Sequence, residues 1–219
     1  MISPMQLPRL YPILDAARFL LAADPLAAML GFAEELMQGG ATLIQYRNKS
    51  DDLRAALDHA RQLRGITRGR ARLIINDRVD LCLAAEADGV HLGQDDLPPD
   101  AVRRILEAAA AAGDPLPRCI GFSTHNPGQV RAAAPLPVDY LAIGPIFATS
   151  SKANPDPIVG LEGVREARKA TERPLVAIGG ITRGNCRSVI EAGADCVAII
   201  SDLVESPRAS VQEFLRLLR

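Results

Sequence analysis

The 219-residue chain alternates between short apolar runs and longer amphipathic stretches. The apolar runs are rich in β-branched and aliphatic residues and do not alternate with polar ones, which is typical of strands buried on both faces. The pattern predicts strands at 9–15, 41–47, 72–77, 89–93, 119–124, 140–145, 175–179 and 196–201. The stretches between and after them predict helices near 25–38, 51–64, 78–86, 99–112, 127–133, 161–171, 184–192 and 207–218.

Regular alternation of strand and helix favours parallel strands joined by right-handed crossovers. Eight such pairs, with no linker between them, predict a single closed (β/α)8 TIM barrel over residues 1–219. A doubly wound open sheet is the alternative, and it would place a glycine fingerprint after the first strand. That strand is followed by Ala16 and Ala17, and no GxGxxG or P-loop motif occurs at any strand end. We therefore favour the barrel, although about 250 residues is the more usual length for this fold.

Charge and aromatic content argue against a nucleic-acid partner. Lys plus Arg number 25 and Asp plus Glu 26, so the formal net charge is −1. A balanced charge provides no basic surface to neutralise phosphates. Aromatic residues make up 4% of the chain and tryptophan is absent, so a base-stacking platform is not expected either.

Four scattered cysteines, Cys82, Cys119, Cys186 and Cys196, form no CxxC pair. Their apolar surroundings predict small buried side chains in a reducing compartment. The first 15 residues do not form a signal-peptide pattern, and no run of about 18 apolar residues could span a bilayer. We expect a cytoplasmic protein with no membrane partner.

In a (β/α)8 barrel, functional groups lie at the C-terminal ends of the strands and in the loops that follow them. The sequence places Gly179 and Gly180 after the seventh predicted strand and Ser201 at the end of the eighth. Glycines allow backbone N–H groups to approach a ligand, and a following helix N-terminus favours an anion. These loops predict a phosphate site, with simple tight turns as the alternative.

Two carboxylates, Asp77 and Asp96, end neighbouring predicted strands. Unpaired carboxylates that face one another repel, and Mg²⁺ is held by one or two such groups together with phosphates and water. Helix capping is the alternative, because Asp is a favoured N-cap residue. Asp95 fits either role as well as Asp96 does, so spacing alone leaves the second ligand open.

Cations gather at the same predicted edge. Arg47 and Lys49 alternate along one strand end and so share a face, and Lys152 lies in the loop over 148–160. Together with Mg²⁺ they indicate a substrate that carries more than one phosphate. A diphosphate leaving group, stabilised by metal and cations, is the chemistry that these residues suit.

The histidines offer little for acyl transfer, because no Ser-His-Asp order occurs. We expect His59 to be solvated on a helix and His91 to be packed inside the barrel. His125 alone is expected at the mouth.

Three stretches match one family in order and at strand ends: Ile-Asn-Asp-Arg-Val-Asp at 75–80, Ala-Asp-Gly-Val-His-Leu-Gly-Gln-Asp-Asp at 87–96, and Tyr-Leu-Ala-Ile-Gly-Pro-Ile-Phe at 140–147. On these residues the chain closely resembles the thiamine-phosphate synthase family, over nearly its whole length. The resemblance implies a transferase that joins a pyrimidine diphosphate to a thiazole phosphate or carboxythiazole phosphate and releases pyrophosphate.

The resemblance also implies roles for individual residues. It assigns one Mg²⁺ per subunit to Asp77 and Asp96, and thereby selects Asp96 over Asp95. It implies no acid, base or nucleophile from the protein. The implied pyrimidine-diphosphate contacts are Gln45, Arg47, Lys49, Asn76, Ser123 and Lys152, and the implied thiazole-phosphate contacts are Thr149, Ser151, Gly180, Ile200 and Ser201.

Two departures from the family pattern stand out. Ser151 replaces a threonine, which keeps the hydroxyl and loses a methyl group. Tyr46 replaces an apolar residue and is expected to face away from the mouth. The implied mechanism is dissociative, with the 148–160 loop as a lid that excludes water. The alternatives are a thiazole tautomerase-like relative, in which His125 would transfer the proton, and a non-catalytic barrel that binds a phosphate ligand.

Overall fold

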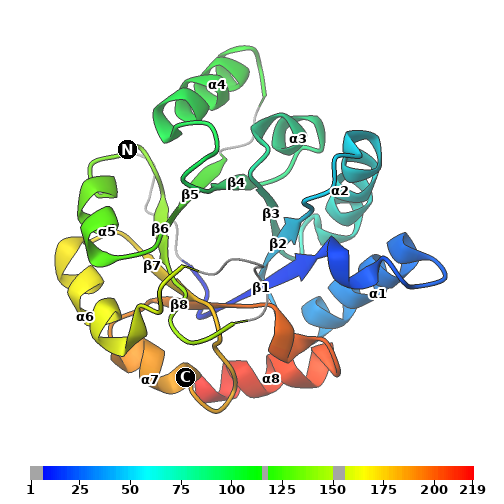
Figure 1. Ribbon diagram of the computed structural model, residues 1–219. Helices are drawn as coiled ribbons and strands as arrows, with labels where there is room; N and C mark the ends of the chain where they lie inside the picture. The colour runs from blue at the N-terminus through cyan, green and yellow to red at the C-terminus, as the bar shows by residue number, and fades with distance from the viewer. Residues whose placement is uncertain (1–6, 115–117, 150–155) are drawn as a thin grey trace.

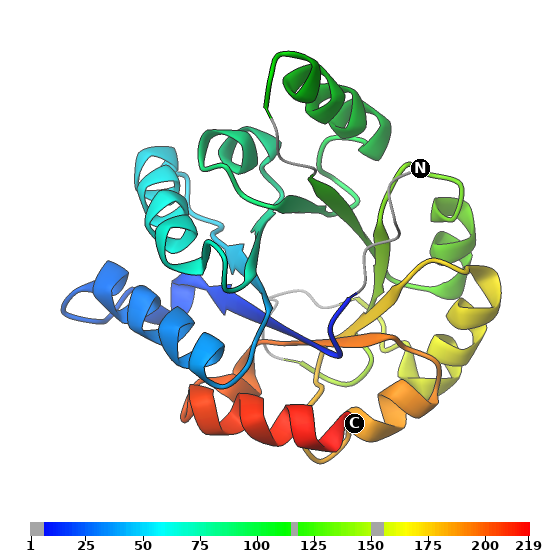
Figure 2. The ribbon, with the colours of Figure 1, turned by 180° about the vertical axis from the view of Figure 1, so that it is seen from behind.

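A computed structural model describes residues 7–114, 118–149 and 156–219, and in it eight parallel strands close into a barrel surrounded by helices (Figure 1). Each strand pairs with the next, and β8 pairs with β1, as the view from behind also shows (Figure 2). The predicted (β/α)8 TIM barrel is therefore confirmed. The strands are β1 Leu10–Asp15, β2 Leu43–Arg47, β3 Arg72–Asn76, β4 Gly89–Leu92, β5 Cys119–Thr124, β6 Tyr140–Ile143, β7 Leu175–Ile178 and β8 Cys196–Ile199.

Helices follow the strands and form the outer ring. They are α1 Pro25–Gln38, α2 Leu53–Thr67, α3 Val79–Ala84, α4 Pro99–Ala111, α5 Pro127–Ala133, α6 Gly160–Ala170, α7 Cys186–Glu191 and α8 Pro207–Leu217, with short 3-10 helices η1 Ala16–Phe19 and η2 Ser201–Leu203. Among the described residues, no helix has both the length and the apolar character needed to cross a bilayer.

Several strands end earlier than the apolar pattern predicts, because the backbone turns sharply at their C-terminal ends. β3 stops before Asp77, whose φ is 65°, and β7 stops before Gly179, whose φ is 100°. Left-handed backbone cannot continue a strand. β8 stops two residues before Ser201, which begins η2. These turns place polar groups around the mouth of the barrel.

Both faces of the strands are buried, as their uninterrupted apolar runs predicted. One face packs against the helices in a large outer core, which includes Leu14, Ile44 and Leu73. The other fills the barrel interior, with its own cluster of Tyr11, Ile13, Leu43, Ile74, Tyr140, Ala142, Val176, Cys196 and Ala198. Above this interior cluster the inward-facing side chains become polar.

Three aspartates at the opposite end of the barrel make the same set of contacts. The Asp88 N–H donates to the Leu73 carbonyl (2.9 Å), and the Asp88 carboxylate accepts from the Leu73 N–H and from Arg64, each at 2.8 Å. Each contact set joins the start of one strand to the preceding strand and to a helix. The other sets are Asp139 with Ile120 and Arg103, and Asp195 with Leu175 and Arg168. We call Asp88, Asp139 and Asp195 the aspartate clamps.

Candidate active site

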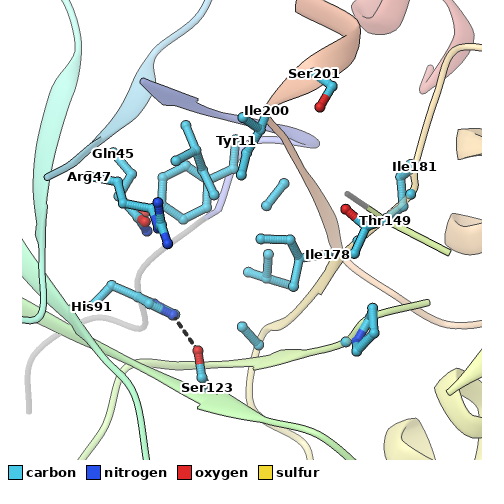
Figure 3. A pocket seen from close by; sticks show the side chains of 18 of the residues that line it. Tyr11, Gln45, Arg47, His91, Ser123, Thr149, Ile178, Ile181, Ile200 and Ser201 are labelled. Carbon is cyan, nitrogen blue, oxygen red and sulfur yellow. Dashed lines mark hydrogen bonds between the residues drawn. The ribbon is translucent and has the colours of Figure 1, made fainter. Parts of the chain in front are cut away.

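A cavity of about 340 Å³ lies at the C-terminal mouth and is lined by residues from all eight strands or the loops after them. Close up, polar side chains from β2, β4 and β5 lie on one side of the cavity (Figure 3). Ile178 of β7 and Ile181 lie on the other side, together with Thr149. Eight of the residues that the resemblance assigns to substrates line it: Gln45, Arg47, Asn76, Ser123, Thr149, Gly180, Ile200 and Ser201. Lys49, Asp77 and Asp96 are not among the lining residues. Ser151 and Lys152 lie outside the described residues, as does the segment 150–155 of the expected lid.

Two carboxylates and a lysine meet directly after β3. Lys49 Nζ lies 2.6 Å from Asp77 Oδ2, and the Asp77 side chain contacts that of Asp96. Asp96 also accepts a 2.6 Å hydrogen bond from the Gly93 N–H. Burial raises the pKa of the Asp96 carboxyl and the adjacent Asp77 raises it further, while the Gly93 hydrogen bond acts in the opposite direction. Two carboxyl groups thus meet beside one ammonium group.

The geometry separates this pair from helix caps. The residues in the N-cap positions of α3 and α4 are Arg78 and Pro98. Asp77 instead adopts a left-handed backbone, which Asp tolerates better than most residues, and its N–H donates to the His91 carbonyl at 2.7 Å. Asp95 is exposed, whereas Asp96 reaches Asp77.

The donor chemistry of Asp77 and Asp96 fits a hard divalent cation. Adjacent carboxylate oxygens suit Mg²⁺, which normally keeps water and takes one or two carboxylates plus substrate phosphates. No group of three or more His, Cys, Asp or Glu side chains that could hold a metal occurs in the part of the chain that the structure describes. A Mg²⁺ held by this pair would complete its ligand set with water and phosphate oxygens.

Arg47 is held by a partner that the sequence analysis missed. Its Nη1 lies 2.6 Å from Oδ2 of Asp15, a buried residue at the end of β1. The two residues are directly opposite in the β1–β2 register. A signal for this pair existed, because both residues close neighbouring predicted strands. The contact orients the guanidinium at the pocket wall.

The predicted phosphate loops pack tightly. Gly180 has a φ of 64°, and a Cβ there would lie 2.4 Å from the Ala148 carbonyl oxygen; a Cβ on Gly179 would lie 2.6 Å from Pro145 Cα. Glycine is therefore needed at both positions, because the backbone turns there and the loop after β6 packs closely against it.

The helix after these glycines begins later than the sequence predicted. The sequence predicted a helix from 184, but α7 begins at Cys186 and has six residues. Asn185 occupies the intervening turn, because its Oδ1 accepts from the Thr182 N–H (2.7 Å) and its Nδ2 donates to the Gly180 carbonyl (3.1 Å). After β8, Ser201 Oγ accepts a 2.8 Å hydrogen bond from Arg18 of η1, a cation that the sequence analysis also missed.

The histidines occupy three different environments. His91 is buried in the barrel, as expected. His125 lines the mouth, and its Nδ1 lies 3.0 Å from the Gly144 carbonyl and 3.3 Å from Asp156 Oδ2. The expectation of a solvated His59 was wrong: it is half-buried, and its Nδ1 lies 3.0 Å from the Tyr46 hydroxyl. Tyr46 thus faces α2 and not the mouth, as strand alternation predicted.

The polar lining of the cavity includes residues that the sequence analysis did not assign to it. Tyr11 and His91 line the pocket, and His91 Nε2 lies 2.9 Å from Ser123 Oγ (Figure 3). The Asn76 Nδ2 is buried and has no hydrogen-bond partner among the residues that the structure describes. Because Asn76 lines the cavity, this amide is a donor available to a ligand.

Comparisons with known proteins agree with one another. A sequence model of the family described as thiamine monophosphate synthase matches residues 10–203. A thiamine-phosphate synthase of Koribacter versatilis is 52% identical over 219 residues, covering 100% of this chain and 99% of the relative. A solved structure of thiamine phosphate pyrophosphorylase from Pyrococcus furiosus superimposes with a TM-score of 0.80 at 31% identity, covering 96% of this chain and 95% of its own. Phosphoribosyl anthranilate isomerase from Thermus thermophilus has a TM-score of 0.63 at 17% identity, and the match covers 96% of this chain and 98% of its own. At that identity the likeness concerns the fold alone.

Proposed function

The chain belongs to the thiamine monophosphate synthase family and is a transferase that condenses a pyrimidine diphosphate with a thiazole phosphate, and from this premise we propose which residues hold the two substrates. The observation that carries the proposal is the meeting of polar residues from β2, β3 and β5 beside the contacting carboxylates Asp77 and Asp96. Arg47, an amide and a hydroxyl thereby line one cavity, next to a carboxylate pair suited to a hard metal ion.

The pyrimidine diphosphate is assigned to the polar side of the pocket. Asn76 supports this, because its buried Nδ2 has no protein partner among the described residues and can donate to a ring nitrogen or a phosphate oxygen. Gln45 and Ser123 supply further amide and hydroxyl groups from neighbouring walls. Arg47 and Lys49 face the diphosphate with their charges, and Lys152 is proposed as the third cation.

Asp77 and Asp96 are proposed to hold one Mg²⁺ per subunit. When bound, the ion supplies positive charge that stabilises the departing pyrophosphate. Lys49, already 2.6 Å from Asp77, places its ammonium group next to the same carboxylates. Arg47 is kept at the wall by Asp15, so its charge is in position before substrate binds.

The reaction that these residues suit is a dissociative substitution. The bond between the pyrimidine methylene carbon and the diphosphate oxygen breaks, and its electron pair leaves with pyrophosphate. The aminopyrimidine ring stabilises the resulting cation, and the lone pair of the thiazole nitrogen forms the new C–N bond. Arg47, Lys49 and Lys152 stabilise the departing charge, so the protein supplies no acid, base or nucleophile.

The thiazole phosphate is assigned to the loops after β6, β7 and β8. Support comes from the close packing of Gly180 against the loop after β6, which brings backbone and the Thr149 and Ser201 side chains to one wall. The aliphatic Ile200 offers the thiazole ring an apolar surface. Ser151 is proposed as a further hydroxyl contact.

All four cysteines are free thiols, and three of them are buried. Free thiols are usual in a reducing compartment, which supports the cytoplasmic location that we propose. Two small phosphorylated substrates are the partners that the site requires.

The test is a coupling assay with purified protein, both substrates and Mg²⁺, in which thiamine phosphate is measured. We expect Asp96→Asn to lower kcat/KM roughly a hundredfold or more, as loss of a group that stabilises a developing charge does. Asp95→Asn is the matched control, one residue away and exposed, and should retain wild-type activity. Equal losses in both variants, or product formed at full rate without Mg²⁺, would contradict the assignment. A His125→Ala variant that loses only thiazole isomerisation would instead favour the tautomerase alternative.

A further inference from the structure

A continuous chain of hydrogen bonds crosses the barrel floor from β2 to β5. Gln45 Nε2 donates to the Tyr11 hydroxyl at 2.9 Å, and that hydroxyl lies 3.1 Å from the hydroxyl of Tyr140. The Tyr140 hydroxyl lies 3.0 Å from His91 Nδ1, and His91 Nε2 lies 2.9 Å from Ser123 Oγ. The chain therefore ends at two residues, Gln45 and Ser123, that the proposed function assigns to the same substrate.

Tyr140 sits in the middle of this chain and is fully buried. It is absent from the pocket lining, whereas its neighbours Tyr11 and His91 are part of it. Its ring stacks on His91, with centroids 5.5 Å apart and planes at 22°. Space for this arrangement comes from Gly121, where a Cβ would lie 2.1 Å from Tyr140 Cζ and 2.5 Å from His91 Nδ1. Gly121 thus leaves room for the Tyr140 hydroxyl between Tyr11 and His91.

Both phenols remain protonated, because burial raises the pKa of Tyr11 and of Tyr140 far above the usual value. A neutral hydroxyl donates one hydrogen bond, and a neutral imidazole donates from one nitrogen and accepts at the other. The direction of each hydrogen bond in this series therefore limits the direction of the next one.

Two directions are possible along the chain, and they differ at Ser123. If Tyr140 donates to His91 Nδ1, the proton of His91 is on Nε2 and is donated to Ser123 Oγ. The Ser123 hydroxyl proton is then available to an acceptor in the pocket. In the reverse direction, Ser123 donates to His91 Nε2 and has no proton left for a phosphate oxygen. Gln45 favours the first direction. Its amide nitrogen donates to the Tyr11 oxygen, so the Tyr11 proton points elsewhere, and the Tyr140 hydroxyl 3.1 Å away can accept it.

We propose that Tyr140 is a positioning residue: by donating to His91 Nδ1 it holds the histidine tautomer that leaves the Ser123 hydroxyl free to donate to the diphosphate of the pyrimidine substrate. This inference rests on the proposed function, which assigns Ser123 to that diphosphate. Tyr140 touches no substrate and acts through His91. It also connects the proton order at Gln45 to that at Ser123, across the width of the pocket.

The first test replaces Tyr140 by phenylalanine, which keeps the ring and its packing. We expect kcat/KM for the pyrimidine diphosphate to fall roughly tenfold or more, the effect of one lost or misdirected hydrogen bond to a charged group. Tyr46→Phe is the matched control. Tyr46 is equally buried and its hydroxyl also contacts a histidine, but it faces α2 and not the pocket. The control should stay within about twofold of wild type, the scale of an effect below 0.5 kcal/mol. Equal losses in the two variants would overturn the inference.

The second test repeats Tyr140→Phe in a Ser123→Ala background. If Tyr140 acts through Ser123, removing its hydroxyl has little further effect once the serine hydroxyl is gone, because the two residues belong to one chain of contacts. If Tyr140 only supports the fold, the two losses multiply. Multiplicative losses would overturn the inference even where both single variants are impaired.

The third test reads the tautomer directly. The protein has three histidines, so the ¹⁵N imidazole signals of His91 can be assigned from a His91→Gln variant. With inorganic pyrophosphate and Mg²⁺ as the probe, wild type should show the proton on Nε2, and Tyr140→Phe should lose this preference. A proton on Nδ1 in active wild type, or an unchanged spectrum in the variant, overturns the inference alone. Failure of wild type to make thiamine phosphate would instead overturn the proposed function.

Discussion

Gly121 shows how one missing side chain shapes the site. Its φ is not in the left-handed region, so its importance lies in volume and not in backbone conformation. A methyl group there would overlap the Tyr140 ring and crowd His91. A full set of buried hydrogen bonds beneath the pocket therefore depends on a residue that makes none of them.

We predict that Gly121→Ala lowers the free energy of unfolding by about 1–3 kcal/mol, as overpacking of a filled core does. Synthase activity should fall with it, because His91 and Tyr140 have to move. Gly65→Ala is the control: Gly65 lies in α2 with no atom near its Cβ position, and alanine there should stabilise the helix by up to about 1 kcal/mol. Denaturant unfolding measures both changes, and a Gly121→Ala variant as stable and active as wild type would contradict the packing argument.

His59 provides a prediction for pH. Burial lowers its pKa from the ordinary value of 6.5, so the folded protein holds the neutral ring more strongly than the unfolded chain does. Between the folded pKa and 6.5 the unfolded state binds more protons, and stability therefore rises with pH in this window and levels off above it. Thermal melts from pH 5 to 8 should show this dependence in wild type and a weaker one in His59→Gln. Parallel curves for the two proteins would exclude a contribution from His59.

At the level of single residues, the sequence identifies most strand-end groups, because their place at the mouth follows from the fold alone. It does not identify their partners. The pairing of Arg47 with Asp15 depends on the register between β1 and β2, and the Arg18–Ser201 contact depends on the path of η1. The buried position of Tyr140 has a similar cause, since it requires the space left by Gly121 on another strand.

Among the elements, the strands and helices are predicted correctly, while several boundaries shift. Apolar runs report burial, and burial continues past the point where hydrogen bonding of the strand ends. Asp77 shows the difference, because it follows an apolar run yet turns out of the strand through a φ of 65°. The start of α7 moved for another reason: the Asn185 side chain completes a turn that the helical pattern had absorbed.

The aspartate clamps lead to a prediction about these elements. Asp139→Ala removes the acceptor of the Ile120 N–H and leaves the Arg103 guanidinium without its carboxylate. We expect a loss of about 1–3 kcal/mol, the range for a buried group deprived of its partner. Glu107→Ala on the exposed face of α4 is the control and should change stability by less than about 0.5 kcal/mol. Because the clamp lies far from the mouth, kcat should be unchanged in the folded variant; a fall in kcat at constant stability would contradict this separation.

For the whole molecule, ligand binding should stabilise the barrel in a way that depends on the carboxylate pair. Pyrophosphate and Mg²⁺ together, at about a hundred times their dissociation constant, should add about 2.7 kcal/mol and raise Tm by roughly 5–10 °C. Asp77→Asn should abolish most of the part that requires Mg²⁺. A differential scanning measurement with each component alone serves as the control. An equal shift in wild type and variant would mean that the ion binds elsewhere.

The aspartate clamps also bear on how such a molecule can change over generations. They repeat before β4, β6 and β8, at the end of the barrel away from the cavity, and Thr42 takes the corresponding place before β2. The aspartate clamps thus stabilise one end of the barrel, while residues that differ from loop to loop form the site at the other end. Mutations that alter the mouth leave the clamps intact, so selection can explore new substrates without first losing the scaffold.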